Sequence, residues 1–96
     1  MSRITNYQDD RFTVVSGLDH MAGNFIQLYD REMEEETPEG EGLILDWSQR
    51  FGISTNFIGI PIQNNHNEIM LIIGKYLSEH VHNLIIITAE QNFSLN

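Results

Sequence analysis

RFTVVSGLDHMAGNFIQLYD (residues 11–30) is the stretch that decides the fold of this chain. Phe12, Val14 and Leu18 fall on one alternation, and residues 24–30 alternate again, which is typical of half-buried β-strands. The segment HMAG (residues 20–23) has the length of a hairpin loop, and Gly23 can supply a positive φ where the turn needs one. We therefore predict an antiparallel pair of strands, residues 12–19 and 24–30.

The sequence after this hairpin extends the sheet. GLILDW (residues 42–47) predicts a third strand of a meander, and SQRFGISTN (residues 48–56) fits either a short helix or a turn. FIGIPI (residues 57–62) has β-branched residues on one alternation, while Gly59 and Pro61 on the other indicate a sheet edge or a bulge. Two further elements are expected nearer the C-terminus.

A helix is predicted after IQNN, because apolar and aromatic side chains recur there at i, i+3 and i+4. This stripe consists of Ile69, Ile72, Ile73, Tyr76, Leu77, His80 and Val81. Asn65 with Glu68 three residues later matches a capping box, although Asn64 fits the cap position as well. The helix is expected to end near His82 or Asn83.

LIIIT (residues 84–88) predicts a strand buried on both faces, at the centre of the sheet. The predicted fold class is α+β: a small antiparallel or mixed β-sheet of about four to five strands, packed against one C-terminal amphipathic helix. At 96 residues the chain is expected to form a single domain, residues 1–96.

Charge and composition limit the classes of function. Five basic and 14 acidic residues give a formal net charge of −9, which disfavours direct binding to nucleic acid or to an anionic membrane surface. The absence of cysteine excludes disulfides, thiolate catalysis and cysteine-type zinc sites. No stretch has the apolar length of a signal core or a membrane span, so a cytoplasmic location is expected.

Eight of the 14 acidic residues lie in one stretch, DREMEEETPEGEGLILD (residues 30–46), and seven of these eight lie between Asp30 and Glu41. Its polar residues, proline and glycines predict a solvated loop between two strands. A loop with no duty in the core is free to present carboxylates to a basic groove, in competition with nucleic-acid phosphate. The residues expected to bind such a partner are Glu32, Glu34, Glu35, Glu36, Glu39 and Glu41, with Trp47 as an anchor.

We therefore expect a non-enzymatic acidic protein-binding module, whose partner is a basic protein or protein complex. In size and charge the chain is similar to small phage-encoded inhibitors of bacterial defence complexes, a likeness of composition that implies occupation of a nucleic-acid-binding surface. The chain itself is expected to be a monomer or a small homo-oligomer. Trp47, Phe51 and Phe57 are expected in the core, unless one of them is exposed beside the acidic stretch and forms a binding hot spot.

The alternative is a regulatory protein that binds Ca²⁺ or another divalent metal through the acidic stretch. Asp30, Glu32, Glu34 and Asp46 are the candidate ligands, since Ca²⁺ takes six to eight oxygen ligands. The EF-hand spacing is absent, because Glu35 stands where that loop needs glycine.

No arrangement of residues predicts catalysis, and no cofactor is expected outside the calcium alternative. Ser16, Asp19 and His20 are the residue types of a catalytic triad, but neighbouring strand residues point to opposite faces. We interpret Asp19 as a turn residue that caps its own loop.

Overall fold

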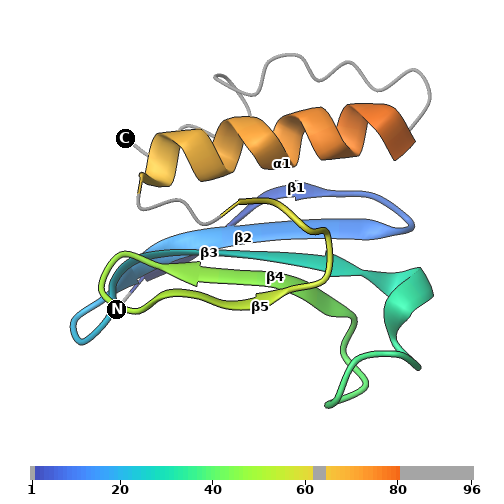
Figure 1. The fold of residues 1–96 in the computed structure, drawn as a ribbon, viewed down its shortest axis with the longest axis horizontal. Coiled ribbons are helices and arrows are strands. Elements are labelled where there is room, and N and C mark those ends of the chain that lie inside the picture. The colour runs from blue at the N-terminus through green and yellow to red at the C-terminus, as the bar shows by residue number, and fades with distance from the viewer. Residues whose placement is uncertain (1, 62–64, 81–96) are drawn as a thin grey trace.

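The computed structural model of the protein describes residues 2–61 and 65–80, which form an α+β fold (Figure 1). The strands β1 (Ser2–Gln8), β2 (Phe12–Asp19), β3 (Gly23–Asp30), β4 (Leu43–Ser48) and β5 (Gly52–Asn56) make an antiparallel sheet in the order β1-β2-β3-β4-β5. A 3-10 turn, η1 (Arg31–Met33), follows β3, and the helix α1 (His66–His80) covers one face of the sheet. The predicted fold class is confirmed. Within the described ranges, no helix has the length and apolar character needed to cross a membrane.

The core lies between α1 and the sheet face beneath it. The sheet contributes Phe12, Val14, Ile26, Leu28, Ile44, Leu45 and Trp47, and the helix contributes Ile69, Met70, Ile73 and Leu77. These side chains are nearly inaccessible to solvent, and burial of their apolar surface is the main force that holds helix and sheet together. The apolar residues that alternate along β2 and β3 therefore pack against the apolar stripe of the helix, as the sequence predicted.

The β2–β3 hairpin is confirmed, with a shorter loop than predicted. Asp19 pairs with Gly23 and Phe12 with Asp30, so the loop is residues 20–22 and Gly23 is the first residue of β3. Gly23 has a φ of +79°, which is the positive value anticipated for this turn. This register places Arg11 next to the end of β3, which matters for the site below.

Two strands were missed or misassigned from the sequence. β1 carries mostly exposed side chains, and β5 occupies residues expected to form a short helix or a turn. Both are edge strands of the described sheet and are held in place by backbone hydrogen bonds to β2 and β4. Their side chains show little apolar alternation, which is the sequence pattern from which a strand is predicted.

The predicted strand over residues 57–62 is wrong for the part that the structure describes, since residues 57–61 form no strand. Asn56 determines this turn through its side chain. Its Oδ1 accepts hydrogen bonds from the amides of Gly59 (3.0 Å) and Ile60 (3.4 Å), and its Nδ2 donates to the Ile60 carbonyl (2.8 Å). Gly59 has a φ of +78°, which is outside the range of a strand.

The start of α1 agrees with the predicted cap. Asn65 Oδ1 accepts from the amides of Asn67 (2.8 Å) and Glu68 (3.3 Å), as an N-cap residue does. The alternative cap Asn64, the predicted helix end near His82 or Asn83 and the predicted strand over residues 84–88 lie outside the described residues.

Candidate functional site

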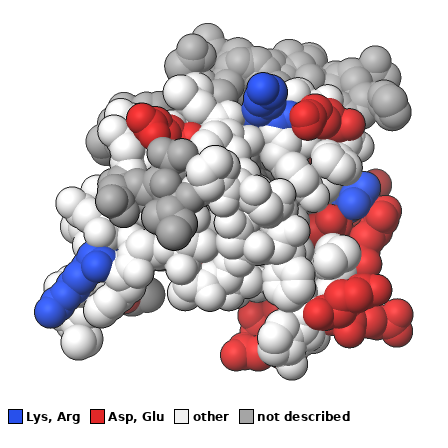
Figure 2. All heavy atoms as spheres, in the orientation of Figure 1, with Lys and Arg blue, Asp and Glu red and all other residues white. Residues whose placement is uncertain are grey.

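The candidate site is the acidic loop, residues 31–41, which connects β3 to β4. Its six glutamates, Glu32, Glu34, Glu35, Glu36, Glu39 and Glu41, are all exposed. Figure 2 shows acidic atoms gathered at the lower right, where Figure 1 places this connection on the side of the sheet that α1 does not cover. The predicted exposure of this acidic segment to solvent is confirmed.

The acidic loop has a defined backbone, although its composition predicted only a solvated segment. After η1, the Glu36 amide donates to Met33 and the Thr37 hydroxyl donates to the Glu34 carbonyl (both 3.1 Å). Thr37 is buried, and its Oγ1 also accepts from the amide of Gly42 (2.9 Å). The glutamates therefore stand on a folded turn with a specific shape.

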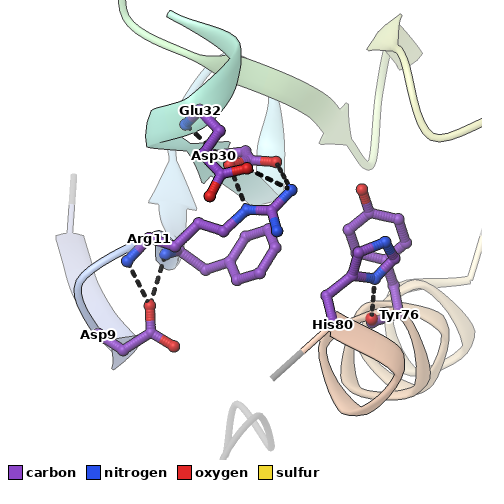
Figure 3. Close-up of polar contacts among 7 residues, drawn as sticks. Asp9, Arg11, Asp30, Glu32, Tyr76 and His80 are labelled. Atoms are coloured by element: carbon purple, nitrogen blue, oxygen red, sulfur yellow. Dashed lines mark hydrogen bonds and ion pairs between the residues drawn. The ribbon is translucent and has the colours of Figure 1, made fainter. Parts of the chain in front are cut away.

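An ion pair between the partly exposed Arg11 and the buried Asp30 fixes the base of this loop (Figure 3). Arg11 Nε lies 2.9 Å from Asp30 Oδ1 and Arg11 Nη2 lies 3.0 Å from Asp30 Oδ2, a bidentate geometry. Asp30 is 1% exposed, and its Oδ1 also accepts from the amide of Glu32 (3.0 Å). The hydrogen bonds that Arg11 donates to Asp30 raise the pKa of Arg11 and outweigh its partial burial, which lowers that pKa, so Arg11 stays charged.

The same arginine links the loop to the rest of the molecule. Its Nη2 lies 3.4 Å from Glu32 Oε1, and its carbonyl accepts from the amide of Arg31 (2.8 Å). The guanidinium also stacks over the ring of Phe12, with its central carbon 4.7 Å from the ring centroid. Phe12 in turn contacts Tyr76 of α1 edge-on, at 6.0 Å between centroids. Thus the acidic loop is connected to the helix through one cation and one ring.

Asp9 organises the turn before β2. Its Oδ1 accepts from the amides of Arg11 (2.7 Å) and Phe12 (2.6 Å), and its Oδ2 accepts from the hydroxyl of Tyr7. Partial burial opposes ionisation of Asp9, but the bonds from Tyr7, Phe12 and Arg11 prevail and lower its pKa. Burial and the bond to Asp9 raise the pKa of Tyr7. This turn positions the Arg11 backbone from which the ion pair is built.

The four candidate calcium ligands are not equivalent in this structure. Both carboxylate oxygens of Asp30 face Arg11, whereas Glu32 and Glu34 are exposed on the acidic loop. Asp46 lies inside β4, paired with Gln27 and Thr55 of the neighbouring strands. No group of three or more potential metal ligands comes together among the residues that the structure describes. No observation here favours the calcium alternative.

Trp47 does not have the exposure of a surface anchor. It is 1% exposed and packs in the core, because it faces α1 from the middle of β4. This burial removes Trp47 from the set of residues able to contact a partner directly. Phe51 (64% exposed) and Phe57 (49% exposed) are the aromatic residues of the predicted cluster that reach the surface, contrary to the expectation that they lie in the core.

The residues of the rejected triad have structural roles or lie apart. Ser16 is buried and its hydroxyl bonds to Asn6 of β1. Asp19 Oδ1 accepts from the amides of Met21 (2.8 Å) and Ala22 (3.4 Å), which confirms the predicted turn cap. These bonds lower the pKa of Asp19, the bond from Met21 having the largest effect. His20 is exposed in the same loop.

A second polar feature lies on the open face, which we define as the sheet face opposite α1. Thr13 and Val15 point there, since they alternate with the core residues Phe12 and Val14. A hollow of about 300 Å³, the open-face hollow, extends over Thr5, Thr13 and Tyr29. Arg3, Arg31, Glu34 and Glu41 are the charged residues at its margin that are discussed below.

Sequence reasoning missed both Arg11 and this hollow. The ion pair joins residues 19 positions apart, and only the register that pairs Phe12 with Asp30 brings them together. A hairpin predicted with a three-residue loop would have placed Arg11 beside Asp30. Arg3 could not be placed without β1, whose pattern of exposed residues gave no signal.

Comparison with known proteins adds no relative. No protein-family model, curated protein or solved structure matches this chain significantly.

Proposed function

We propose that this protein is a non-enzymatic binding module of the cytoplasm whose acidic loop docks on a basic surface of a partner protein. The observation that carries the proposal is that six exposed glutamates stand on a folded loop, whose base is held by the Arg11–Asp30 ion pair. Carboxylates carried on a folded backbone meet a partner with less loss of conformational freedom than those of a disordered acidic segment do. The affinity gains from this preorganisation.

Electrostatics also shape the approach of the partner. With a net charge of −9, the protein attracts a basic surface over a range limited by the Debye length, about 8 Å at physiological salt. Attraction of this kind raises the association rate and favours a partner whose positive groove complements the loop. Such grooves commonly serve to bind nucleic-acid phosphates.

The mechanism is therefore competition. The loop glutamates occupy lysine and arginine side chains that the partner uses for nucleic acid, so that the partner holds either this protein or its nucleic acid. An inhibitor of a nucleic-acid-dependent complex, such as a phage protein acting against a bacterial defence complex, fits this mechanism. The buried position of Trp47 means that the apolar part of the contact must come from other residues.

The test compares two variants that remove the same charge from different places. Glu34, Glu35 and Glu36 are changed to glutamine in the loop variant. In the control variant, the exposed Asp10, Glu68 and Glu79 are changed to asparagine or glutamine. Each tagged variant and the wild type is used to recover partners from nuclease-treated lysate of the native host, and each recovered protein is then tested for displacement of bound nucleic acid.

We expect the wild type and the control variant to recover a basic protein that the loop variant does not recover. We also expect nucleic acid to be displaced from this partner in proportion to the amount of the acidic protein that binds it. Equal losses in the two variants would mean that total charge, and not the loop, attracts the partner. A partner whose nucleic acid stays bound would remove the competitive mechanism.

A further inference from the structure

The open-face hollow has the features of a small-ligand site. Its volume of about 300 Å³ is at the lower end of the range found for ligand pockets. Thr5, Thr13 and Tyr29 line it, and their hydroxyls can donate or accept hydrogen bonds. Thr13 and Tyr29 are directly paired across β2 and β3, so this part of the hollow belongs to the central sheet. The floor is therefore rigid and polar.

Arginines are concentrated at this hollow. Three of the five basic residues of the chain line it, Arg3, Arg11 and Arg31. Arg11 is neutralised by Asp30, but Arg3 and Arg31 form no ion pair with any carboxylate of the described residues. In a chain with almost three acidic residues for each basic one, two uncompensated guanidinium groups at one hollow indicate a place for an anionic group.

Arg3 is held in position for this purpose. Its Nη1 donates to Gln27 Oε1 (2.9 Å) and its Nη2 donates to the Tyr29 hydroxyl (3.5 Å). The Tyr29 hydroxyl donates to the same Gln27 oxygen (3.1 Å). All of these partners are neutral, so they orient the guanidinium without cancelling its charge, and its remaining N–H groups are available to a ligand.

The hollow also has a negative side, formed by Glu34 and Glu41 of the acidic loop. These carboxylates disfavour a phosphate, which carries more negative charge than a carboxylate and would lie close to both. They suit an ammonium group. We propose that the open-face hollow binds a small amphoteric ligand of the amino-acid class, with its carboxylate on Arg3 and Arg31 and its ammonium group on Glu34 and Glu41.

This site is distinct from the docking surface although the two share glutamates. Arg3 lies on β1 and has no role in the proposed contact with a basic partner. Failure of partner recovery and failure of ligand binding can thus be told apart, because a change at Arg3 affects the ligand alone.

The test is a titration of the ¹⁵N-labelled protein, followed by NMR at the amides of Thr5, Thr13 and Tyr29. The probes are alanine, glutamine and leucine, each as the free L-amino acid, as the N-acetyl acid without an ammonium group, and as the amide without a carboxylate. We expect saturable shifts with at least one free amino acid and about tenfold weaker binding of both of its blocked forms, the lower end of what a charge-assisted hydrogen bond contributes.

Matched variants identify the two halves of the site. Arg3→Gln is expected to weaken binding of the free amino acid about tenfold, while Arg50→Gln, the same change in the turn between β4 and β5, leaves it unchanged. Glu41→Gln is expected to weaken it similarly, while Glu35→Gln, a loop glutamate that does not line the hollow, does not. No saturable shift with any free amino acid overturns the proposal. Equal binding of the N-acetyl acid also overturns it, because the site would then take any carboxylate.

Discussion

Replacing Arg11 with methionine tests whether the Arg11–Asp30 ion pair holds the base of the acidic loop. Methionine keeps an apolar stem against Phe12 but leaves the carboxylate of Asp30, which is 1% exposed, without its cation. Removing one partner of a buried pair costs about 3–5 kcal/mol. The Arg11 side chain is 31% exposed, so water can reach part of the site, and we expect a loss of about 2–4 kcal/mol.

The assay is urea unfolding of the wild type and of three variants: Arg11→Met, Asp30→Asn and the double change. In thermal unfolding the Arg11→Met loss corresponds to a decrease of about 10–25 °C in Tm for a chain of this size. The double variant should be more stable than Arg11→Met by at least about 1 kcal/mol, because it no longer buries an uncompensated carboxylate. Arg50→Met is the control, since Arg50 lies at the far end of the sheet and forms no ion pair within the described part of the chain.

A loss below about 1 kcal/mol for Arg11→Met, or a double variant whose loss is the sum of the two single losses, would refute this reasoning. Either result would mean that solvent compensates the Asp30 carboxylate and that backbone hydrogen bonds alone fix the loop. The salt dependence gives a second check. Because Asp30 is buried, this pair should respond less to added salt than an ion pair on the surface, which is screened.

Two other predictions concern the turn geometry on either side of this pair. Gly42 has a φ of +77°, and a Cβ there would lie 2.3 Å from the Asp30 carbonyl oxygen. Gly42→Ala should therefore lower the free energy of unfolding by more than about 2 kcal/mol, measured in urea. Gly40 has a φ of +71° but open space around it, so Gly40→Ala should lower it by only about 1 kcal/mol. Equal costs would contradict the clash. The pKa of Asp9 is lowered in the folded state, so its contribution is complete above its ordinary value of 3.8 and is lost as the pH falls through the folded pKa. Asp9→Asn should therefore flatten the dependence of Tm on pH in acid, and an unchanged slope would contradict this assignment.

The sequence reveals those parts of the fold that are built by burial. Ile26 and Leu28 flank the polar Gln27 on β3 and pack against the helix stripe that contains Ile73, so the pattern of apolar residues alone pairs the two layers. β1 and β5 depend on backbone pairing with a neighbour, and side-chain pattern does not record which strand an edge segment joins. Composition located the acidic loop, but its folded form depends on Thr37, whose hydroxyl joins two parts of the loop.

The candidate site was harder to predict because it depends on which strands pair and in which register. The run of glutamates is visible in the sequence. The pairing of Asp30 with Arg11 is not, because it depends on the register of the β2–β3 hairpin, and the predicted hairpin loop was one residue too long. The open-face hollow is lined by Arg3 of β1 and by Glu41 of the acidic loop, two residues that lie far apart in the sequence. Local patterns do not carry this information.

The order β1-β2-β3-β4-β5 has a consequence for how the protein folds. Each described strand pairs with its neighbour in the sequence, so no strand has to insert between two that are already paired. The closing loops are short except for the one between β3 and β4, and the entropy of closure rises with loop length. The sheet can therefore grow strand by strand as the ribosome releases the chain, with the β2–β3 hairpin as an early nucleus and α1 docking on a face that is already assembled.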